Sequence, residues 1–290
     1  MAQNNKILSI RLIVLLSGGL FFSSFFRPNE SKSNPVSALK LVVAMLDSIH
    51  NIKTLSFQIK AYERIENNFI SAESKVKISM KPHMIYFRNE KKKIFILWQE
   101  GLNGGNAEVK SKMSLGTALS LDPHGNLMRK NQHYTIFELG FEYFAKVFST
   151  TLAHDKDNLN KNLVYVGKKI LREKNCFVLA YEDKNFGYMD YKTAKNESVS
   201  SIAAKFNTND YAIRSKNNLH SFYGNIKEGT LLKIPNNYCK KIILYLDETT
   251  LLPMNMTSFD DVGLYENYEY SKVEMNKKIN KEDFLQFYKD

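Results

Sequence analysis

Residues 57–62 read FQIKAY and residues 75–81 read KVKISMK, and in both stretches apolar and polar side chains alternate. An alternation with a period of two residues places one set of side chains on each face of a β-strand. One face of each strand is then buried and the other is solvated, which is typical of antiparallel sheets. The two stretches therefore predict half-buried antiparallel strands.

Further strands are predicted on both sides of this pair. Residues 94–98 (IFILW) are apolar throughout and predict a strand that is buried on both faces, and the cluster 103–106 (NGGN) predicts a turn after it. The other predicted strands cover residues 85–87, 107–110, 163–171, 176–182, 240–247, 254–259 and 264–273. The pattern predicts a large antiparallel sheet with a few helices lying on it, which is an α+β fold.

Two helices are predicted from their first residues and their apolar spacing. Asn34 can cap and Pro35 can open a helix whose apolar side chains recur at helical spacing, namely Leu39, Val42, Val43, Leu46 and Ile49. Residues 135–138 (TIFE) form a capping box, in which the Thr hydroxyl and the Glu carboxylate satisfy each other's backbone N–H groups. The second helix is predicted to begin there, with an aromatic stripe of Phe137, Phe141, Phe144 and Phe148.

The composition is that of a protein with a folded, soluble part. Of the 290 residues, 43% are hydrophobic and 24% are charged, which excludes a collagenous, disordered or multi-spanning membrane protein. The 41 Lys and Arg residues exceed the 30 Asp and Glu residues and give a net charge of +11. The basic residues are dispersed and form no arginine-rich cluster that would track phosphates, so no nucleic-acid partner is predicted.

The N-terminus reads as an export signal. Lys6 and Arg11 precede an apolar run of 15 residues at 12–26, which resembles the charged and apolar regions of a secretory signal. The run is just short of the roughly 17 to 25 residues that span a bilayer, and no clear small-x-small cleavage site follows it. Residues 1–27 are therefore predicted to be either a signal peptide or a retained N-terminal anchor, and residues 28–34 a linker. The predicted location is the periplasm or cell envelope, with anchoring in the inner membrane left open.

Residues 188–236 have a different pattern from their surroundings. Residues 188–191 (YMDY) predict a short strand, and 196–198 (NES) predict the start of a helix whose apolar side chains follow at helical spacing. Residues 209–217 predict a second short helix, and residues 226–235 predict a turn and a closing strand. The segment is therefore predicted to be a βααβ unit.

This unit resembles a LysM module. The matching stretches are 197–206 (ESVSSIAAKF), 211–219 (YAIRSKNNL) and 226–235 (IKEGTLLKIP), with the alanine, asparagine, glycine and terminal Ile-Pro in register. LysM modules bind N-acetylglucosamine polymers such as peptidoglycan in a shallow groove between the strand-to-helix loop and the loop before the last strand. The resemblance implies a carbohydrate-binding groove made by Asn196, Glu197, Ser198 and Val199 on one side and Asn225, Ile226 and Lys227 on the other.

Two departures from the LysM pattern leave an alternative open. The usual Gly-Asp-Thr-Leu of the first loop is Asn-Glu-Ser-Val at residues 196–199, and the loop after Leu219 carries the bulky pair Phe222-Tyr223. In the alternative, the module no longer binds sugar and serves as a rigid insert or as a docking surface for another protein.

The framework around this unit resembles the LolA-like superfamily of periplasmic lipoprotein and lipid carriers. Residues 121–129 (LDPHGNLMR) followed by 133–141 (HYTIFELGF) are similar to an uncharacterised branch of it, described only as a domain of unknown function. The resemblance implies an open half-barrel with helices on its concave face and a cavity for acyl chains. The predicted domains are thus a LolA-like domain in two parts, 35–187 and 237–290, with the LysM module nested at 188–236.

No catalytic or metal-binding residues are predicted. Asp122, His124, His133 and Glu138 lie close in sequence, but Glu138 is explained by the capping box and Asp122 by a turn, and their spacing fits no metal motif. The chain has no Gly-x-Ser-x-Gly motif and no phosphate-binding glycine loop. It is predicted to be non-enzymatic and to need no cofactor.

The two cysteines are predicted to stay reduced. If residues 176–182 and 240–247 pair as antiparallel strands, Cys176 lies opposite Leu246 or Asp247, whereas Cys239 lies at the other end of the pair. About six residues at roughly 3.4 Å each exceed the approximately 7 Å limit between the Cα atoms of a disulfide. The same pairing places Glu182 near Lys240 at the root of the βααβ unit.

Together these features predict a non-enzymatic envelope protein, in which a lipid-binding or lipoprotein-binding domain is held at peptidoglycan or another N-acetylglucosamine polymer by the LysM module. The predicted cargo is a lipid or a lipoprotein. The alternative is a structural, cell-wall-associated scaffold whose sheet and degenerate LysM module dock other proteins.

Overall fold

The computed structural model describes residues 37–114, 116–219 and 224–286. The predicted signal or anchor at 1–27, the linker at 28–34, the helix-opening pair Asn34-Pro35 and the aromatic pair Phe222-Tyr223 lie outside the described residues.

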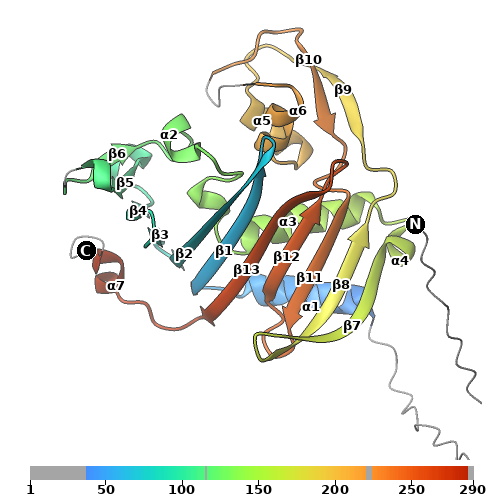
Figure 1. Cartoon of the computed structure of the whole chain (residues 1–290), viewed down its shortest axis with the longest axis horizontal. Coiled ribbons are helices and arrows are strands. Elements are labelled where there is room, and N and C mark those ends of the chain that lie inside the picture. The colour runs from blue at the N-terminus through green and yellow to red at the C-terminus, as the bar shows by residue number, and fades with distance from the viewer. Residues whose placement is uncertain (1–36, 115, 220–223, 287–290) are drawn as a thin grey trace, which may run out of the picture. The chain divides into compact units, whose positions relative to one another are not determined.

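The framework is one antiparallel sheet of 11 strands in the order β6-β5-β4-β3-β2-β1-β13-β12-β11-β8-β7 (Figure 1). The sheet is open, because β6 and β7 each pair with one neighbour. Its strands are β1 (Thr54–Ile65), β2 (Asn68–Met80), β3 (His83–Asn89), β4 (Ile94–Gln99), β5 (Ala107–Lys110), β6 (Leu119–Leu121), β7 (Leu163–Leu171), β8 (Lys174–Glu182), β11 (Lys241–Asp247), β12 (Pro253–Phe259) and β13 (Leu264–Met275). All the predicted strands of the framework are present, and β6 is an additional short edge strand that the sequence pattern did not indicate.

Helices α1 (Ala38–His50) and α3 (Glu142–His154) lie across one face of this sheet (Figure 1). The side chains that join them to the sheet form the main core, which includes Val42, Met45, Phe57, Phe141 and Leu179. The α+β class predicted from the sequence is therefore confirmed. The shorter helices are α2 (Asn126–Arg129), α4 (Leu159–Asn162) and α7 (Lys281–Leu285), and single 3-10 turns occur at η1 (Asn103–Gly105), η2 (Lys112–Ser114) and η3 (Ile136–Glu138).

The buried face of α1 differs from the predicted one. Val42 and Ile49 are buried as predicted, but Leu39 and Val43 are 44% and 51% exposed, and Leu41 and Met45 are buried in their place. The apolar positions of this helix extend more than halfway around it, so their spacing alone does not decide which of them faces the sheet.

The capping box of residues 135–138 is present, but it does not begin the long helix as predicted. It caps only the 3-10 turn η3, and Gly140 at φ +92° then redirects the chain before α3 starts at Glu142. A side chain at that φ would be strained, and a Cβ there would lie 3.1 Å from Ile78. As a result Phe137 packs on Trp98 in a separate cluster, whereas Phe141, Phe144 and Phe148 belong to the main core.

The LysM unit consists of β9 (Tyr188–Lys192), α5 (Val199–Phe206), α6 (Asp210–Lys216) and β10 (Leu231–Pro235), as the sequence predicts. Strands β9 and β10 pair as a separate two-stranded sheet. The unit has its own apolar core, centred on Ile202, Ile213 and Ile234, each fully buried. It leaves and re-enters the framework between β8 and β11, where the Asp183 N–H donates to the Lys240 carbonyl at 2.8 Å.

The register of β8 and β11 confirms the prediction about the cysteines. Cys176 lies opposite Asp247, and Cys239 precedes the opposite end of β11. Both cysteines are free and buried, and burial raises the pKa of the Cys239 thiol well above its ordinary value.

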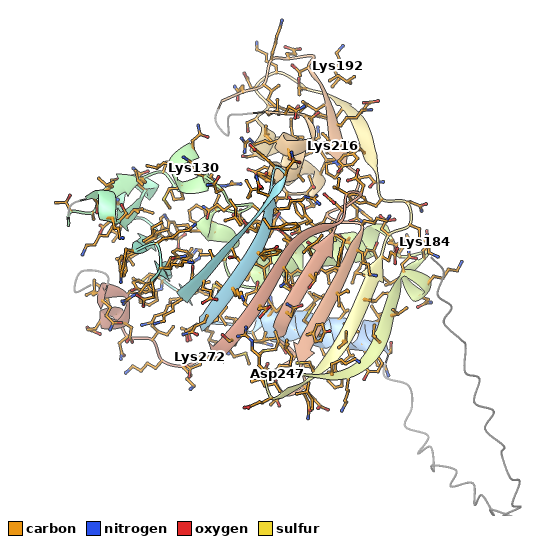
Figure 2. All side chains as sticks on the ribbon, viewed as in Figure 1. Lys130, Lys184, Lys192, Lys216, Asp247 and Lys272 are labelled. Atoms are coloured by element: carbon orange, nitrogen blue, oxygen red, sulfur yellow. The ribbon has the colours of Figure 1, made fainter. Side chains whose placement is uncertain are left out.

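The positive charge is spread over the molecule. Figure 2 shows Lys130, Lys184, Lys192 and Lys272 far apart on different elements, and each of them is exposed.

We expect the Phe141→Ala variant to lose about 3 to 5 kcal/mol of unfolding free energy, because it removes a fully buried ring from the core between α3 and the sheet. Val43→Ala on the exposed side of α1 is the control and should change the unfolding free energy by no more than about 0.5 kcal/mol. Urea denaturation monitored by the fluorescence of the single tryptophan, Trp98, measures both. Equal losses in the two variants would contradict this account of the core.

Candidate ligand cavity and carbohydrate groove

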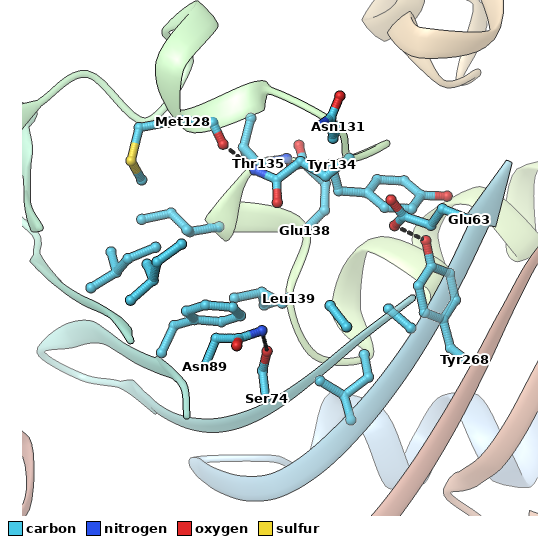
Figure 3. Close-up of a pocket in the computed structure, with 18 of the residues that line it drawn as sticks. Glu63, Ser74, Asn89, Met128, Asn131, Tyr134, Thr135, Glu138, Leu139 and Tyr268 are labelled. Atoms are coloured by element: carbon cyan, nitrogen blue, oxygen red, sulfur yellow. Dashed lines mark hydrogen bonds between the residues drawn. The ribbon is translucent and has the colours of Figure 1, made fainter. Parts of the chain in front are cut away.

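A cavity of about 350 Å³ lies between the sheet and the segment that runs from α2 to α3 (Figure 3). Strands β1 to β6 supply most of its floor, and residues 127–147 cover it. Most of its lining is apolar, including Ile59, Ile96, Met128, Leu139 and Phe144. Sites for small ligands typically measure about 300 to 1,000 Å³ and are lined in this way. The cavity therefore has the size and character of a site for an apolar ligand.

One end of this cavity is polar and buried. Glu63 on β1 lines it and is only 8% exposed, and Glu266, directly opposite on β13, is 2% exposed. Two like charges directly opposite each other on neighbouring strands destabilise a sheet. A third group must therefore compensate this pair.

That group is His133. Its backbone N–H donates to the Glu63 carboxylate at 2.9 Å, and its ring Nδ1 lies 2.9 Å from the Glu266 carboxylate. Ring Nε2 lies 2.9 Å from the Arg64 carbonyl, which can only accept a hydrogen bond. Because both ring nitrogens face acceptors, the ring is the doubly protonated imidazolium. Burial by itself lowers the pKa of His133, but the charges of Glu63 and Glu266 outweigh burial and raise this pKa above its ordinary value of 6.5.

Tyrosine hydroxyls complete the cluster around the two carboxylates. Tyr268 donates to Glu63 at 2.5 Å, Tyr134 donates to Glu266 at 3.0 Å, and Tyr238 also donates to Glu266. Burial raises the pKa of Glu266, but the hydrogen bonds from its partners, led by His133, outweigh burial and hold this pKa below its ordinary value of 4.5. We call these six residues, Glu63, His133, Tyr134, Tyr238, Glu266 and Tyr268, the acid cluster.

The LysM unit is bound to this cluster through α6. The ring of Tyr211 stacks on one side of His133 at 4.6 Å, and Tyr265 of β13 stacks on the other side at 4.3 Å. Next to this stack, Asp210 forms an ion pair with Arg129 at 2.6 Å, and Arg129 also donates to the His133 carbonyl at 2.9 Å. The unit is therefore not a flexible appendage of the framework, and a deletion of residues 188–236 would expose His133 and leave Arg129 without its carboxylate.

The sequence pattern indicates His133 but not its partners. Glu63 follows Phe57, Ile59 and Ala61 on the same face of β1, and a carboxylate on a buried face is rare unless it is paired. That break in the alternation is the signal that could have found the site. The other sequence candidates do not join the acid cluster. Glu138 lines the cavity, but its carboxylate caps η3. Asp122 accepts from the His124 N–H, and the His124 ring lies against Phe137.

We expect the acid cluster to give the protein a pH-dependent stability. The raised pKa of His133 contributes stability that is fully present below about pH 6.5 and is lost as the pH rises through the folded-state pKa. The lowered pKa of Glu266 contributes stability that is present above about pH 4.5 and is lost as the pH falls through the folded-state value. The contribution of the pair is therefore largest between these limits, as urea denaturation across pH 4 to 9 would show.

His133→Gln should remove the loss of stability on the alkaline side and should destabilise the fold by about 3 to 5 kcal/mol at pH 6, because it leaves two buried carboxylates uncompensated. His154→Gln at the exposed end of α3 is the matched control and should keep the wild-type profile. An unchanged profile in His133→Gln would show that the ring is neutral.

The structure brings the two predicted loops of the LysM groove together. The Ile226 N–H donates to the Glu197 carbonyl at 2.7 Å, and the Lys227 carbonyl accepts from the Thr193 hydroxyl at 2.8 Å. A side chain of the first loop also has a structural part in the unit. The Glu197 carboxylate accepts from the Tyr191 hydroxyl at 2.6 Å.

The remaining predicted groove residues divide into buried and exposed ones. Val199 is buried in the core of the unit, and the Ser198 hydroxyl caps α5. Asn196, Asn225 and Lys227 are exposed. These three side chains are the ones that the structure leaves available at the predicted groove.

Within the described part of the chain, no cluster of three or more His, Cys, Asp or Glu residues could hold a metal ion. Among the same residues, no helix is both long enough and apolar enough to cross a membrane.

Two family models match the sequence. The family described as "Protein of unknown function (DUF1571)" matches residues 52–196, and the LysM domain matches residues 191–235. The predicted LysM module and the predicted family of unknown function are both confirmed. The comparison with curated proteins gives no match.

Several solved structures are similar at low sequence identity. The lipoprotein LppX of Mycobacterium tuberculosis has 9% identity and a TM-score of 0.39, over 84% of this chain and 97% of that one. LprF of Mycobacterium bovis has 12% identity and a TM-score of 0.39, over 84% of this chain and 95% of that one. The matched chain in the MucA/MucB complex of Pseudomonas aeruginosa has 12% identity and a TM-score of 0.37, over 85% of this chain but only 60% of that one.

Proposed function

This chain belongs to the DUF1571 family, and we propose that it is a non-enzymatic protein of the cell envelope that holds a lipid, or the acyl part of a lipoprotein, in its cavity and binds peptidoglycan through its LysM domain. The observation that carries the first half is the 350 Å³ cavity with its apolar lining. The LysM match at residues 191–235 supports the second half. In this proposal the two parts of the framework, 35–187 and 237–290, form one ligand-binding domain around the module at 188–236.

The location follows from the same features. Peptidoglycan lies outside the cytoplasm, and the apolar run at 12–26 after Lys6 and Arg11 has the pattern of an export signal. We therefore place the protein in the periplasm or cell envelope, with residues 1–27 as a cleaved signal or as an inner-membrane anchor.

The carrier is favoured over a scaffold that docks proteins on its sheet. A scaffold of that kind should present exposed aromatic side chains on the sheet. Among the described residues, Phe69 is the one exposed large aromatic hydrophobe, at 42%, and its ring already stacks on Tyr62 at 4.6 Å. By contrast, Phe87, Tyr143, Phe144 and Tyr270 all line the cavity.

Solvent extraction of the purified protein followed by mass spectrometry tests the carrier half. We expect about one lipid per protein in the wild type and a large loss in Ala61→Phe, because Ala61 lines the cavity and the ring would occupy it. Ala180→Phe, on β8 and outside the cavity lining, is the matched control and should retain the lipid. A protein that yields no lipid, and that binds no added amphiphile after delipidation, would contradict the carrier.

Cosedimentation with purified peptidoglycan tests the LysM half. We expect the wild type to pellet with peptidoglycan and the double variant Asn196→Gly, Asn225→Ala to lose at least tenfold in affinity, because two exposed amide side chains are removed from the predicted groove. Glycine is chosen at position 196 because this residue has φ +66°, which glycine adopts without strain.

The matched control is Asn207→Gly at the end of α5, which makes the same change at φ +49° away from the two loops. Equal binding of peptidoglycan by the double variant and the control would show that the predicted groove residues do not contribute to sugar binding. If the wild type does not bind, the module is degenerate and the scaffold alternative gains support. Point variants are used in place of a deletion, since a deletion would also remove Tyr211 and Asp210 from their contacts with the framework.

A further inference from the structure

We propose that the cavity selects amphiphiles whose head group donates hydrogen bonds and carries no negative charge, an ammonium or a hydroxyl, and that Glu63 and its tyrosine neighbours bind this head group at the buried end. The inference rests on the proposed function, because it names the class of apolar ligand that the cavity takes. Three features of the acid cluster support it: the direction of its hydrogen bonds, its charge, and its place in the cavity.

The hydrogen bonds of the acid cluster leave acceptors, but no donors, for a ligand. A tyrosine hydroxyl has one proton, and those of Tyr134, Tyr238 and Tyr268 are directed at Glu63, at Glu266 or at one another. The backbone N–H and both ring nitrogens of His133 are likewise directed at protein acceptors. Carboxylate and hydroxyl lone pairs are what remains within the cluster, so a head group that binds to the cluster itself must donate.

The charge of the acid cluster also disfavours a negatively charged head group. Glu63 and Glu266 carry two negative charges and the His133 imidazolium carries one positive charge, which leaves the cluster negative. The nearby arginines have other partners: Arg64 pairs with Asp260, and Arg129 pairs with Asp210 on the LysM side. Arg214, also on the LysM side, interacts electrostatically with Asp210. A carboxylate or phosphate brought to Glu63 would therefore meet a like charge in a buried site, which is unfavourable.

An amphiphile could lie in the cavity with its head group at Glu63 or with its head group at the opposite end. The positions of the lysines that line the cavity distinguish these two orientations. Among the described residues that line the cavity, the cations are Lys92 and Lys130, and both are exposed. Figure 2 places Lys130 beside α2. An anionic lipid with its head group at these lysines would place its methyl end against Glu63 and the tyrosines. The methyl end would exclude water from their remaining lone pairs and would offer no hydrogen bond in its place, which is unfavourable.

Four side chains next to the acid cluster form an apolar surface that fits the alkyl tail of such an amphiphile. Ile59, Ala61, Tyr270 and Met256 line the cavity beside Glu63 and Tyr268, and Figure 3 shows Glu63 and Tyr268 at one side of the cavity, with Met128 at the other. The head group would thus lie over β1 and β13 on the cavity side of the sheet, and the alkyl chain would extend beneath residues 127–140 toward β4 and β5.

Calorimetric titration of the delipidated full chain at pH 7 with three amphiphiles of one length tests the inference: dodecylammonium, dodecanol and laurate. We expect dodecylammonium and dodecanol to bind at least tenfold more tightly than laurate. The ratio between the first two then shows whether charge or hydrogen bonding contributes more. This series uses the wild type alone, so it does not depend on the folding of any variant.

Variants then assign the preference to Glu63. Glu63→Gln should lower the affinity for dodecylammonium about tenfold and should leave the affinity for laurate unchanged or slightly higher. Tyr268→Phe keeps the Glu63 charge and frees one of its oxygens, so it should keep or strengthen the preference for dodecylammonium. Glu73→Gln, on the neighbouring strand β2 and exposed, is the matched control and should behave as the wild type.

Laurate that binds as tightly as dodecylammonium or more tightly would overturn the inference while leaving the cavity as a lipid site. Loss of that laurate binding in Lys92→Gln or Lys130→Gln would establish the opposite orientation. If none of the three amphiphiles binds, the proposed carrier function fails together with the inference. If Glu63→Gln keeps the full preference for dodecylammonium, the recognition does not use Glu63.

Discussion

The two glutamates that face each other across β1 and β13 are the constraint on which the rest of the site depends. Glu63 and Glu266 are paired in the register of the sheet and both are buried, so their repulsion has to be offset within the protein. The His133 imidazolium lies between them and offsets one charge. Because His133 comes from the segment between α2 and η3, the same interaction fixes the cover of the cavity onto the sheet.

The acid cluster also determines how the LysM unit is held. Tyr211 completes the aromatic stack on His133, and Asp210 binds the arginine that supports the His133 carbonyl. The module is thus joined to the framework through His133, which belongs to the segment that covers the cavity. In the proposed function, the residues that hold the LysM unit to the framework are therefore next to the residues that bind the head group.

Local sequence patterns predicted most of the secondary structure and much of the LysM unit. The alternation at 57–62 and 75–81 lies within β1 and β2, and the βααβ order of the LysM unit matches β9, α5, α6 and β10. These patterns are reliable because each depends on neighbours two to four residues apart. The prediction was wrong where the outcome depended on distant partners, as in the buried face of α1 and in the start of α3, where Gly140 packs against Ile78 of β2.

The sequence by itself determined the α+β class, the presence of a LysM module with its βααβ order, and the separation of the cysteines. Only the tertiary structure decided that a cavity exists and that its polar end is acidic. The reason is that strand pairing brings together residues far apart in the chain: His133 and Glu266 are separated by 133 positions, and no local pattern links them. A single glutamate on the buried face of a strand is unfavourable by itself, and it becomes a binding element only when the fold supplies the groups around it.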